Sequence, residues 1–172
     1  MHALPENILE KFTYGFYIVT TRVSATELDT RDQDYLAAGT VSWVMQSSFE
    51  PPMVTLAIQK ESDLNETMGK AYRFAINVLG KDDRKMINAF AKESTIADQK
   101  INGYPYLNGL KTDAPILQDG LGFIECEVAD IIKTEGDHVL FVGKVVHHKL
   151  RKPEAMPLHE WETSKHYGGI VS

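Results

Sequence analysis

The chain has 172 residues, of which 18 are lysine or arginine and 24 are aspartate or glutamate, giving a formal net charge of −6. This length supports a single domain with its own core, and the 43% of apolar residues argues against wholesale disorder. The net acidity, without any basic stripe, disfavours nucleic acid as the main partner.

Cys126 is the only cysteine, so the sequence excludes an intrachain disulfide and a zinc site built from several cysteines. The residues after Met1 lack the basic and apolar regions of a signal peptide. No apolar run approaches the ~20 residues that span a bilayer. We therefore expect a cytoplasmic protein that does not contact a membrane.

The first part of the chain alternates strands with polar breaks. Residues 12–21 are aromatic and β-branched, which predicts a strand that is apolar on both faces. Residues 24–34 have the polar composition of a long loop, and residues 36–45 resume as a strand. Pro51 and Pro52 remove two backbone donors and end this strand in an extended turn.

Two short helices are predicted between the strands that follow. Residues 53–60 alternate apolar and polar side chains, which predicts a half-buried strand. Ser62 or Asp63 caps the first helix, and residues 74–79 form the next strand. The second helix begins at one of two aspartates, Asp82 or Asp83.

The last part of the chain predicts an irregular connection and a hairpin. Residues 102–122 are rich in glycine, proline and asparagine, which is typical of a connection without regular structure. Two long strands follow, and a turn at residues 135–137 joins them into a hairpin that ends at Leu150. Mostly antiparallel strands with a few short helices predict one mainly β, barrel-like domain over residues 1–172.

Several familiar enzyme signatures are absent from the sequence. It contains no Gly-x-Gly-x-x-Gly motif, no Gly-Lys-Ser/Thr phosphate loop and no Gly-x-Ser-x-Gly elbow. The segment that starts at His159 has Thr163 where a zinc-protease helix needs its second histidine. His147 and His148 are adjacent on a predicted strand and point to opposite faces, so we expect no metal site.

Polar side chains gather where one strand ends and where the next helix starts. The first group is Ser42, Gln46, Ser47 and Ser48, and the second is Lys60, Ser62, Asn65 and Thr67. Free N–H groups and the dipole at a helix N-terminus favour an anion, and hydroxyl groups beside a lysine suit a phosphate. Taken alone, however, such residues are more often a helix cap and a strand end that bind nothing.

Several segments in a specific order give the chain a resemblance to a known family. They are Gly39–Trp43 followed by Ser47–Val54, then Phe74–Leu79, Phe90–Lys92, Gly122–Val128 and Asp137–Val145. In this order, the sequence from about Tyr14 to Lys149 resembles the flavin reductase-like family of FMN-binding split-barrel proteins. The resemblance implies a homodimer of split β-barrels with flavin near the subunit interface. A partner subunit is also expected to cover the outer face of the strand at residues 12–19.

The resemblance assigns further residues to the flavin. The strand end that lies along the ring system comprises Ser42, Trp43, Val44, Met45, Gln46, Ser47 and Ser48. The segment Ser62–Thr67, including Asn65 and preceded by Lys60, reaches the phosphate. Lys100 loosely matches the family's basic residue after the Phe-Ala helix and is the expected phosphate cation. Lys92 is its rival, because the family's usual Gly-Arg pair is Lys92-Glu93 in this chain.

Aromatic and imidazole side chains are further candidates beside the flavin. Trp43 and Phe49 either stack near the ring or belong to the core. His138 opens the strand that approaches the flavin edge in the family, and it is our catalytic candidate because its imidazole hydrogen-bonds the flavin or places a nicotinamide. A surface histidine without function is an equal alternative. Tyr167 matches a C-terminal aromatic residue that the family tends to keep near the cofactor.

We expect a flavin reductase in which NADH or NADPH gives a hydride to bound FMN, with FAD as an alternative flavin. The pyridine nucleotide binds transiently, and placement rather than an acid–base pair carries the reaction. A monooxygenase or redox protein then receives the electrons. Two alternatives stay open: an FMN electron carrier that serves a rubredoxin-like or diiron partner, and a binding module without a cofactor.

Overall fold

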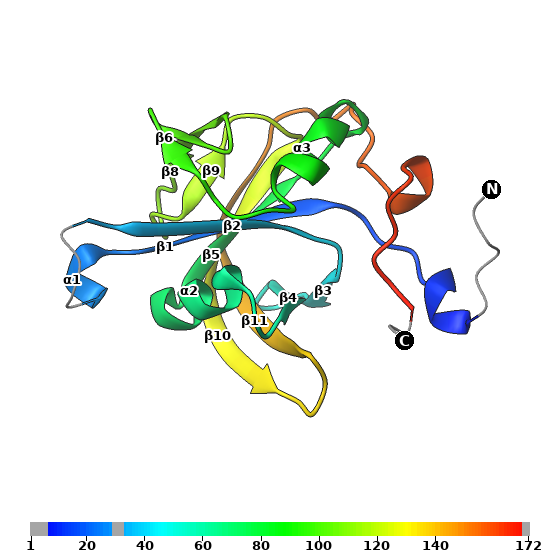
Figure 1. Ribbon diagram of the computed structural model, residues 1–172, viewed down its shortest axis with the longest axis horizontal. Coiled ribbons are helices and arrows are strands. Elements are labelled where there is room, and N and C mark those ends of the chain that lie inside the picture. Colours follow the sequence, from blue (N-terminus) through cyan, green and yellow to red (C-terminus); the bar gives the residue numbers. More distant parts are fainter. Residues whose placement is uncertain (1–6, 29–32, 170–172) are drawn as a thin grey trace.

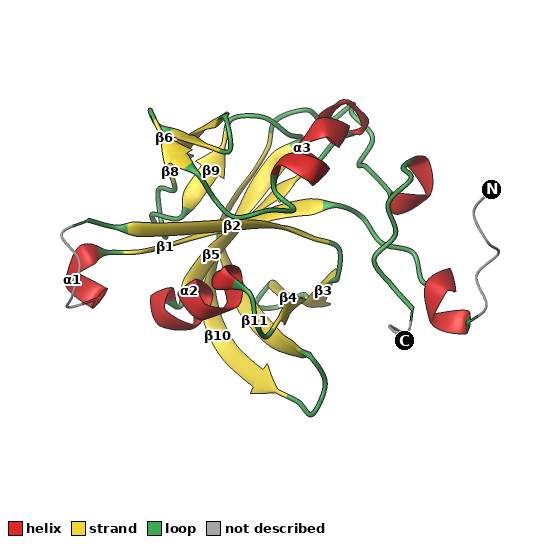
Figure 2. Cartoon of the chain, viewed as in Figure 1, coloured by secondary structure: helices red, strands yellow, loops and turns green. Residues whose placement is uncertain are grey.

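Antiparallel strands dominate the computed structural model, which describes residues 7–28 and 33–169 (Figure 1). In that part of the chain, the strands form one large sheet and one small sheet, and the helices are short (Figure 2). The predicted fold class, a mainly β split barrel with a few short helices, is confirmed.

Each strand belongs to one of the two sheets, and short helical segments connect them. The strands of the large sheet are β1 (Tyr17–Val23), β2 (Tyr35–Val41), β3 (Val44–Ser48), β4 (Met53–Gln59), β5 (Arg73–Val78), β10 (Gly122–Lys133) and β11 (His138–Leu150). Those of the small sheet are β6 (Ile96–Ala97), β7 (Lys100–Ile101), β8 (Tyr104–Asn108) and β9 (Pro115–Leu117). The helical segments are η1 (Ile8–Lys11), α1 (Ala25–Leu28), α2 (Asp63–Ala71), η2 (Lys81–Asp83), α3 (Arg84–Ala89) and η3 (Glu160–Glu162). Within the described residues, none of these helices combines the length and the apolar character needed to cross a bilayer.

The large sheet curls because a two-residue link joins its two edge strands. The spatial order is β2-β1-β5-β10-β11-β4-β3, yet only Ser42 and Trp43 separate β2 from β3 in the chain. The link turns tightly, since the Val44 N–H donates to the Ser42 carbonyl at 3.0 Å. The Trp43 carbonyl accepts from the Ala57 N–H of β4, also at 3.0 Å. The two edges of the sheet therefore meet at this corner, and the sheet becomes a barrel.

Alternating apolar side chains of the strands fill the barrel interior. Val19, Leu56 and Phe141 are buried there, and α2 adds Leu64 and Met68 to the same core. The predicted strands at residues 53–60 and 74–79, the two helices after them and the final hairpin are confirmed within one or two residues. These are the parts of the chain with the clearest periodicity and capping.

The outer face of β1 is covered by the chain itself. Ile18 is fully buried in a second core, together with Phe90 after α3 and Leu117 of β9. Figure 1 shows α3 and the small sheet on one side of β1 and β2, and α2 with the β10–β11 hairpin on the other. The expectation that a partner subunit covers this strand is therefore wrong, because α3 and the small sheet already do so.

Three predicted boundaries are wrong for local reasons. The first strand begins at Tyr17 rather than at residue 12, because the residues before it pair with the C-terminal segment: the Phe16 N–H donates to the Leu158 carbonyl at 3.2 Å. The expected loop at residues 24–34 contains α1, while its residues 29–32 lie outside the described residues. The expected strand at residues 36–45 is divided into β2 and β3 by the tight link.

The region expected to be irregular, residues 102–122, contains β8 and β9. Left-handed backbone conformations, with φ between 50° and 59°, make sharp turns before and between these strands at Asp98, Gln99, Asn102 and Asp113. The expected irregular connection is therefore wrong in part: Pro105 and Asn108 lie in β8 and Pro115 in β9, while Asn102 lies in a turn. The strands between the turns are too short to show a periodic pattern of their own.

A buried asparagine ties the small sheet to the barrel. Asn77 of β5 is fully buried, and its Nδ2 donates to the Ile18 carbonyl of β1 at 3.0 Å. Its Oδ1 accepts from the Leu117 N–H of β9 at 2.8 Å. At the same contact between the barrel and the small sheet, Thr20 Oγ1 donates to the Pro115 carbonyl. Because unmade hydrogen bonds are costly in a buried place, this network fixes β9 against the barrel.

Glu125 of β10 anchors the turn between β8 and β9. The carboxylate is fully buried and its Oε1 accepts from the Thr112 N–H at 2.9 Å and from the Lys111 N–H at 3.1 Å, while Oε2 lies 2.5 Å from His147 Nδ1. Burial raises the pKa of Glu125, but the hydrogen bonds from His147, Thr112 and Lys111 outweigh it and the net pKa is lowered. The anchor therefore stabilises the fold above the pH at which an unfolded glutamate titrates, and it is lost as the pH falls through the lowered pKa.

Asn77→Ala should lower the free energy of unfolding by about 2–4 kcal/mol, because the buried Leu117 N–H loses its acceptor and a small cavity is left. Urea unfolding followed by tryptophan fluorescence measures the change. Gln118→Ala serves as the matched control, because it removes an exposed side chain directly after Leu117. Its free energy of unfolding should change by no more than about 0.5 kcal/mol. Equal stability of the two variants would contradict the anchoring role of Asn77.

Candidate active site

A cavity of about 500 Å³ lies where segments far apart in the sequence meet. They are the second half of β2, the end of β4, the start of α2, residues 90–94 after α3, and residues 165–167. The walls are apolar at Ala38, Val41, Leu64 and Phe90, and polar or charged at Ser42, Ser62, Asp63, Lys92, Glu93, Lys165 and His166. Cofactor and substrate sites typically have volumes of about 300–1,000 Å³, so the cavity is large enough for one.

Four of the residues predicted for the flavin site line this cavity. They are Ser42, Ser62, Lys92 and Tyr167. Ser42 follows β2, Ser62 precedes α2, and Lys92 follows α3, so the fold brings together residues that the sequence separates widely. Their roles in binding stay predictions.

The start of α2 offers backbone N–H groups to the cavity rather than free side chains. The Ser62 Oγ accepts from the Asn65 N–H at 3.1 Å, which makes Ser62 the N-cap. The Asn65 Nδ2 donates to the Lys60 carbonyl at 2.8 Å, and the Thr67 Oγ1 donates to the Asp63 carbonyl at 2.8 Å. Because these side chains are engaged by the backbone, and the Asn65 N–H by Ser62, the donors left for an anion at this end are the N–H groups of Asp63 and Leu64.

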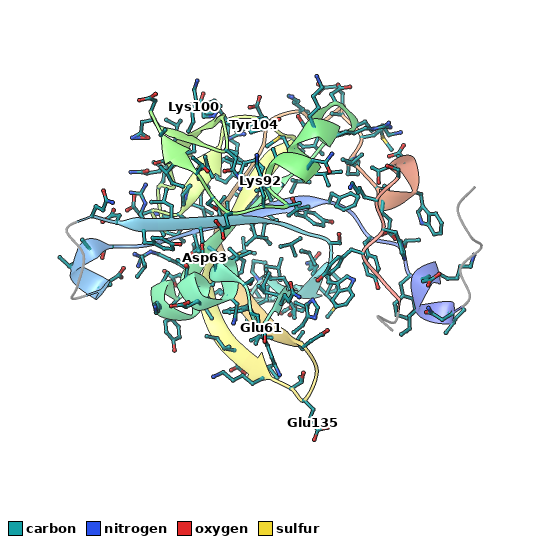
Figure 3. The ribbon with its side chains drawn as sticks, viewed as in Figure 1. Glu61, Asp63, Lys92, Lys100, Tyr104 and Glu135 are labelled. Carbon is teal, nitrogen blue, oxygen red and sulfur yellow. The ribbon has the colours of Figure 1, made fainter. Side chains whose placement is uncertain are left out.

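The three candidate lysines lie in different places, and Lys92 is the one that lines the cavity. The Lys60 Nζ donates to the Thr134 carbonyl at 2.6 Å, in the turn between β10 and β11. Figure 3 shows Lys100 beside Tyr104 at the outer end of the small sheet, with Lys92 nearer to α2. The structure therefore favours Lys92 over Lys100 as a cation of this cavity.

Strand β3 lies outside the cavity. Val44, Met45 and Gln46 line a second, apolar groove instead, and the Met45 side chain is exposed. Ser47 and Ser48 complete this strand, and the Ser47 Oγ hydrogen-bonds the Thr55 hydroxyl at 2.9 Å. Phe49, in the turn after β3, is 90% exposed, so it belongs to neither the core nor the cavity wall.

Trp43, His138 and Tyr167 form a ring cluster at the edge of the cavity. The ring centroid of Trp43 lies 4.6 Å from that of His138 and 5.1 Å from that of Tyr167. The ring of Tyr14, from the segment before β1, lies 6.2 Å from that of Trp43. The indole Nε1 of Trp43 is buried and has no hydrogen-bond partner among the described residues. Trp43 itself is not among the residues that line the cavity, so this donor lies beside it.

The imidazole of His138 is held on both sides. The Nδ1 lies 2.6 Å from the Asp137 Oδ1, and the Nε2 lies 2.9 Å from the Tyr167 hydroxyl. The hydrogen bond from His138 lowers the pKa of Asp137, while burial, followed by the charge of Asp137, raises the pKa of Tyr167. A carboxylate on Nδ1 favours the tautomer with its proton there, which leaves Nε2 to accept from the Tyr167 hydroxyl.

Sequence reasoning missed Asp137, Asp63, Lys165 and His166. Asp137 directly precedes His138, but neighbours on a strand point to opposite faces, so the contact was not predictable from a strand pattern. The contact forms because Asp137 belongs to the turn before β11. Lys165 and His166 stand next to Tyr167, and that adjacency was the available signal.

The described residues include no group of three or more histidine, cysteine, aspartate or glutamate side chains that could hold a metal ion. Cys126 is buried, and burial, followed by the charge of Glu125, raises its pKa to about 12. The cavity offers an apolar interior and hydrogen-bond donors, and its lining carries two lysines, Lys92 and Lys165, and two acids, Asp63 and Glu93. This combination suits an apolar or planar ligand with an anionic group that one of the lysines contacts.

The sequence matches the family described as "Flavin reductase like domain" over residues 9–168. The chain belongs to this family. The resemblance seen in the sequence segments is thereby confirmed, and the cavity, the ring cluster and the barrel all lie within the matched part of this flavin reductase-like domain.

Curated relatives of this flavin reductase-like domain are longer proteins. "Diflavin flavoprotein A 1" of Synechocystis is 26% identical over 94% of this chain and 27% of that protein. "Probable flavin reductase" of Rhizobium meliloti is 34% identical over 57% of this chain and 30% of that protein. The match therefore covers less than a third of the length of each of these relatives.

A solved structure has the same fold as this domain. It is the NADH:FAD oxidoreductase SgcE6 of Streptomyces globisporus, with a TM-score of 0.71 and 23% sequence identity. The match covers 86% of this chain and 81% of SgcE6. The split-barrel architecture is therefore shared by sequences that differ at most positions.

Proposed function

We propose that this flavin reductase-like domain binds FMN in the cavity and catalyses hydride transfer from NADH or NADPH to the flavin. One observation carries the proposal: apolar walls, a helix start and Lys92 meet in one cavity of a chain that belongs to this family. The names of the relatives, a flavin reductase and a diflavin flavoprotein, support a flavin as the cofactor.

The residues of the cavity fit a flavin nucleotide. Ala38, Leu64 and Phe90 give apolar walls for a planar ring system. Beside the cavity, the Nε1 of Trp43, whose ring contacts that of Tyr167, is a buried donor without a partner among the described residues. The first turn of α2 and Lys92 supply donors and a cation for a phosphate. FMN is the proposed flavin and FAD the alternative, because both carry a phosphate next to the ribityl chain.

The chain supplies placement, and a bound flavin supplies the hydride-accepting centre. Lys92 and the first turn of α2 bind the phosphate, and the apolar walls exclude water. His138, with its Nδ1 held by Asp137, keeps a fixed ring orientation next to Tyr167 and positions the incoming nicotinamide. Hydride transfer needs alignment more than proton transfer, so His138 is expected to raise the rate without being indispensable.

A second candidate function is an FMN electron carrier that serves a rubredoxin-like or diiron partner. One observation favours it: the chain corresponds to 27% of a protein named a diflavin flavoprotein, so domains of this kind occur within longer proteins. For the reductase, a monooxygenase or redox protein is the corresponding electron acceptor. We propose a cytoplasmic location for either role, since the single thiol, that of Cys126, is free and buried.

NADH or NADPH oxidation by the purified chain should require flavin, and His138→Ala should slow it about tenfold to a hundredfold, the size of a positioning defect. The absorbance of the reduced nicotinamide measures turnover. His159→Ala, which removes an exposed histidine outside the cavity, should leave the rate unchanged.

Three outcomes would decide between the candidates. Complete loss of turnover in His138→Ala with intact flavin binding would contradict a positioning role. Flavin binding by the wild type without any oxidation of NADH or NADPH would favour the electron carrier. No flavin absorbance after mixing with FMN would favour a binding module without a cofactor.

Lys92→Ala should weaken FMN binding about tenfold or more, because a charge-assisted hydrogen bond to the phosphate is lost. Riboflavin, which lacks the phosphate, should bind both proteins almost equally, as measured by fluorescence quenching. Lys100→Ala is the matched control, since its lysine lies at the outer end of the small sheet. If Lys100→Ala weakened FMN binding and Lys92→Ala did not, the phosphate cation would be Lys100 after all.

We also propose a homodimer that forms through the second, apolar groove. This groove of about 410 Å³ lies between β3, the start of β4, the start of β10 and the end of β11. Met45 and Leu150, both among its lining residues, are 61% and 63% exposed. Large exposed apolar side chains around a groove are typical of an interaction surface, and a second copy supplies a matching one.

Light scattering at micromolar concentration should give the wild type about twice the 19.3 kDa mass of one chain. The double variant Met45→Glu and Leu150→Glu should shift toward the monomer, because two charges then face the apolar groove. Leu110→Glu, at a leucine that is 83% exposed elsewhere on the surface, is the control. A wild type that scatters as a monomer would contradict the proposal.

A further inference from the structure

A buried acid lies behind one wall of the cavity. Glu160, in η3, has a side chain that is 1% exposed. Neither of its carboxylate oxygens makes a hydrogen bond with another described residue. A buried carboxylate without partners is costly, so its surroundings have to supply a compensating positive charge.

Two backbone hydrogen bonds hold Glu160 in place. Its N–H donates to the Tyr14 carbonyl at 3.0 Å, and its carbonyl accepts from the Thr163 N–H at 2.9 Å. The charge of Glu160 also raises the pKa of Tyr14, in addition to the larger effect of burial. Among the described residues, the basic side chain within ion-pair distance is that of His166, whose Nδ1 lies 3.0 Å from the Glu160 Oε2.

His166 connects this buried acid to the cavity. Its ring lines the cavity, and the side chain is 35% exposed. Its Nδ1 lies within ion-pair distance of the Glu160 carboxylate without meeting the geometry of a hydrogen bond, and the second nitrogen, Nε2, has no hydrogen-bond partner among the described residues. In an ion pair with this carboxylate both ring nitrogens carry protons, and Nε2 is then a second N–H donor.

Basic side chains accompany His166 in the lining of the cavity. Lys165 and Lys92 line the same cavity, so cationic groups approach it from two separate segments. The lining also carries two acids, Asp63, which accepts from the Tyr35 hydroxyl at 2.9 Å, and Glu93, which is exposed like the two lysines. Phosphate oxygens only accept hydrogen bonds, and they are the natural complement of a cationic donor.

We propose that His166, held by the buried carboxylate of Glu160, binds a phosphate group of the nucleotide that occupies the cavity. The phosphate belongs either to the flavin nucleotide or to the pyridine nucleotide. His166 is thus a binding residue, and Glu160 is a positioning residue that acts through it. This inference rests on the proposed function and adds to it a contact from the C-terminal segment.

The test uses four ligands, so that phosphate contacts are separated from all others. Binding of FMN and of riboflavin is measured by fluorescence quenching. Turnover with NADH and with a reduced N-benzylnicotinamide, which carries no phosphate, gives KM and kcat for each donor. The variants are His166→Ala, His166→Lys and Glu160→Gln, and His159→Ala is the matched control on the same segment.

His166→Ala should weaken the binding of the phosphate-bearing ligand about tenfold. The binding of its phosphate-free counterpart should change by no more than about twofold. If the flavin phosphate is the partner, the dissociation constant of FMN rises. If the pyridine nucleotide supplies it, the KM for NADH rises at nearly constant kcat. His166→Lys, which keeps the positive charge, should restore most of the affinity. Glu160→Gln should show the same ligand pattern with a smaller change.

Two results would overturn the inference while leaving the proposed function intact. One is a His166→Ala variant that matches the wild type with all four ligands. The other is an equal loss of phosphate-bearing and phosphate-free ligands, which would show that the pair supports the fold of the C-terminal segment. A wild type that neither binds FMN nor oxidises NADH would overturn the proposed function, and this inference with it.

Discussion

The two-residue link between β2 and β3 is the constraint on which the rest of the structure depends. Ser42 and Trp43 join the strands at the two edges of the large sheet, so the sheet has to close at that corner. Closure carries the Trp43 ring to the start of β11, where it lies 4.6 Å from His138. The end of β2 and the start of α2 then line one cavity. In a flat sheet with the same strand order, β2 and β4 would lie at or near opposite edges.

The cavity wall formed by the C-terminal segment does not depend on closure of the barrel. It is fixed by a few hydrogen bonds to the residues before β1, among them those from Phe16 to Leu158 and from Glu160 to Tyr14. Leu158 is almost fully buried, while Tyr167 at the cavity is 45% exposed. The C-terminal segment is therefore anchored at Leu158, while the residues with which it lines the cavity, Tyr167 and His166, are exposed.

The sequence predicts those features of the structure that depend on residues close together in the chain, and it does not predict those that depend on contacts between distant segments. The strand at residues 53–60 and the cap at Ser62 were predictable, because alternation and capping act between near neighbours. The small sheet was not, since its place depends on long-range bonds such as that from Leu117 to Asn77. The choice between Lys92 and Lys100 likewise depends on which segment folds over the cavity. Glu160 and His166 lie in a segment without periodicity, where no sequence pattern marks the pair.

A site of this kind leaves a weak sequence signal for a physical reason. When the reactive centre belongs to a cofactor, the protein has to supply shape, apolar walls and main-chain donors, and many sequences can do so. The fold shared with SgcE6 at 23% identity fits this view. What distinguishes one such domain from another is then the set of charged side chains around the cavity. In this chain those groups include Lys92, Lys165 and His166, and the last forms an ion pair with an acid that is buried beneath the C-terminal segment. In the proposed function, the selection of a nucleotide therefore rests on side chains that lie outside the barrel core.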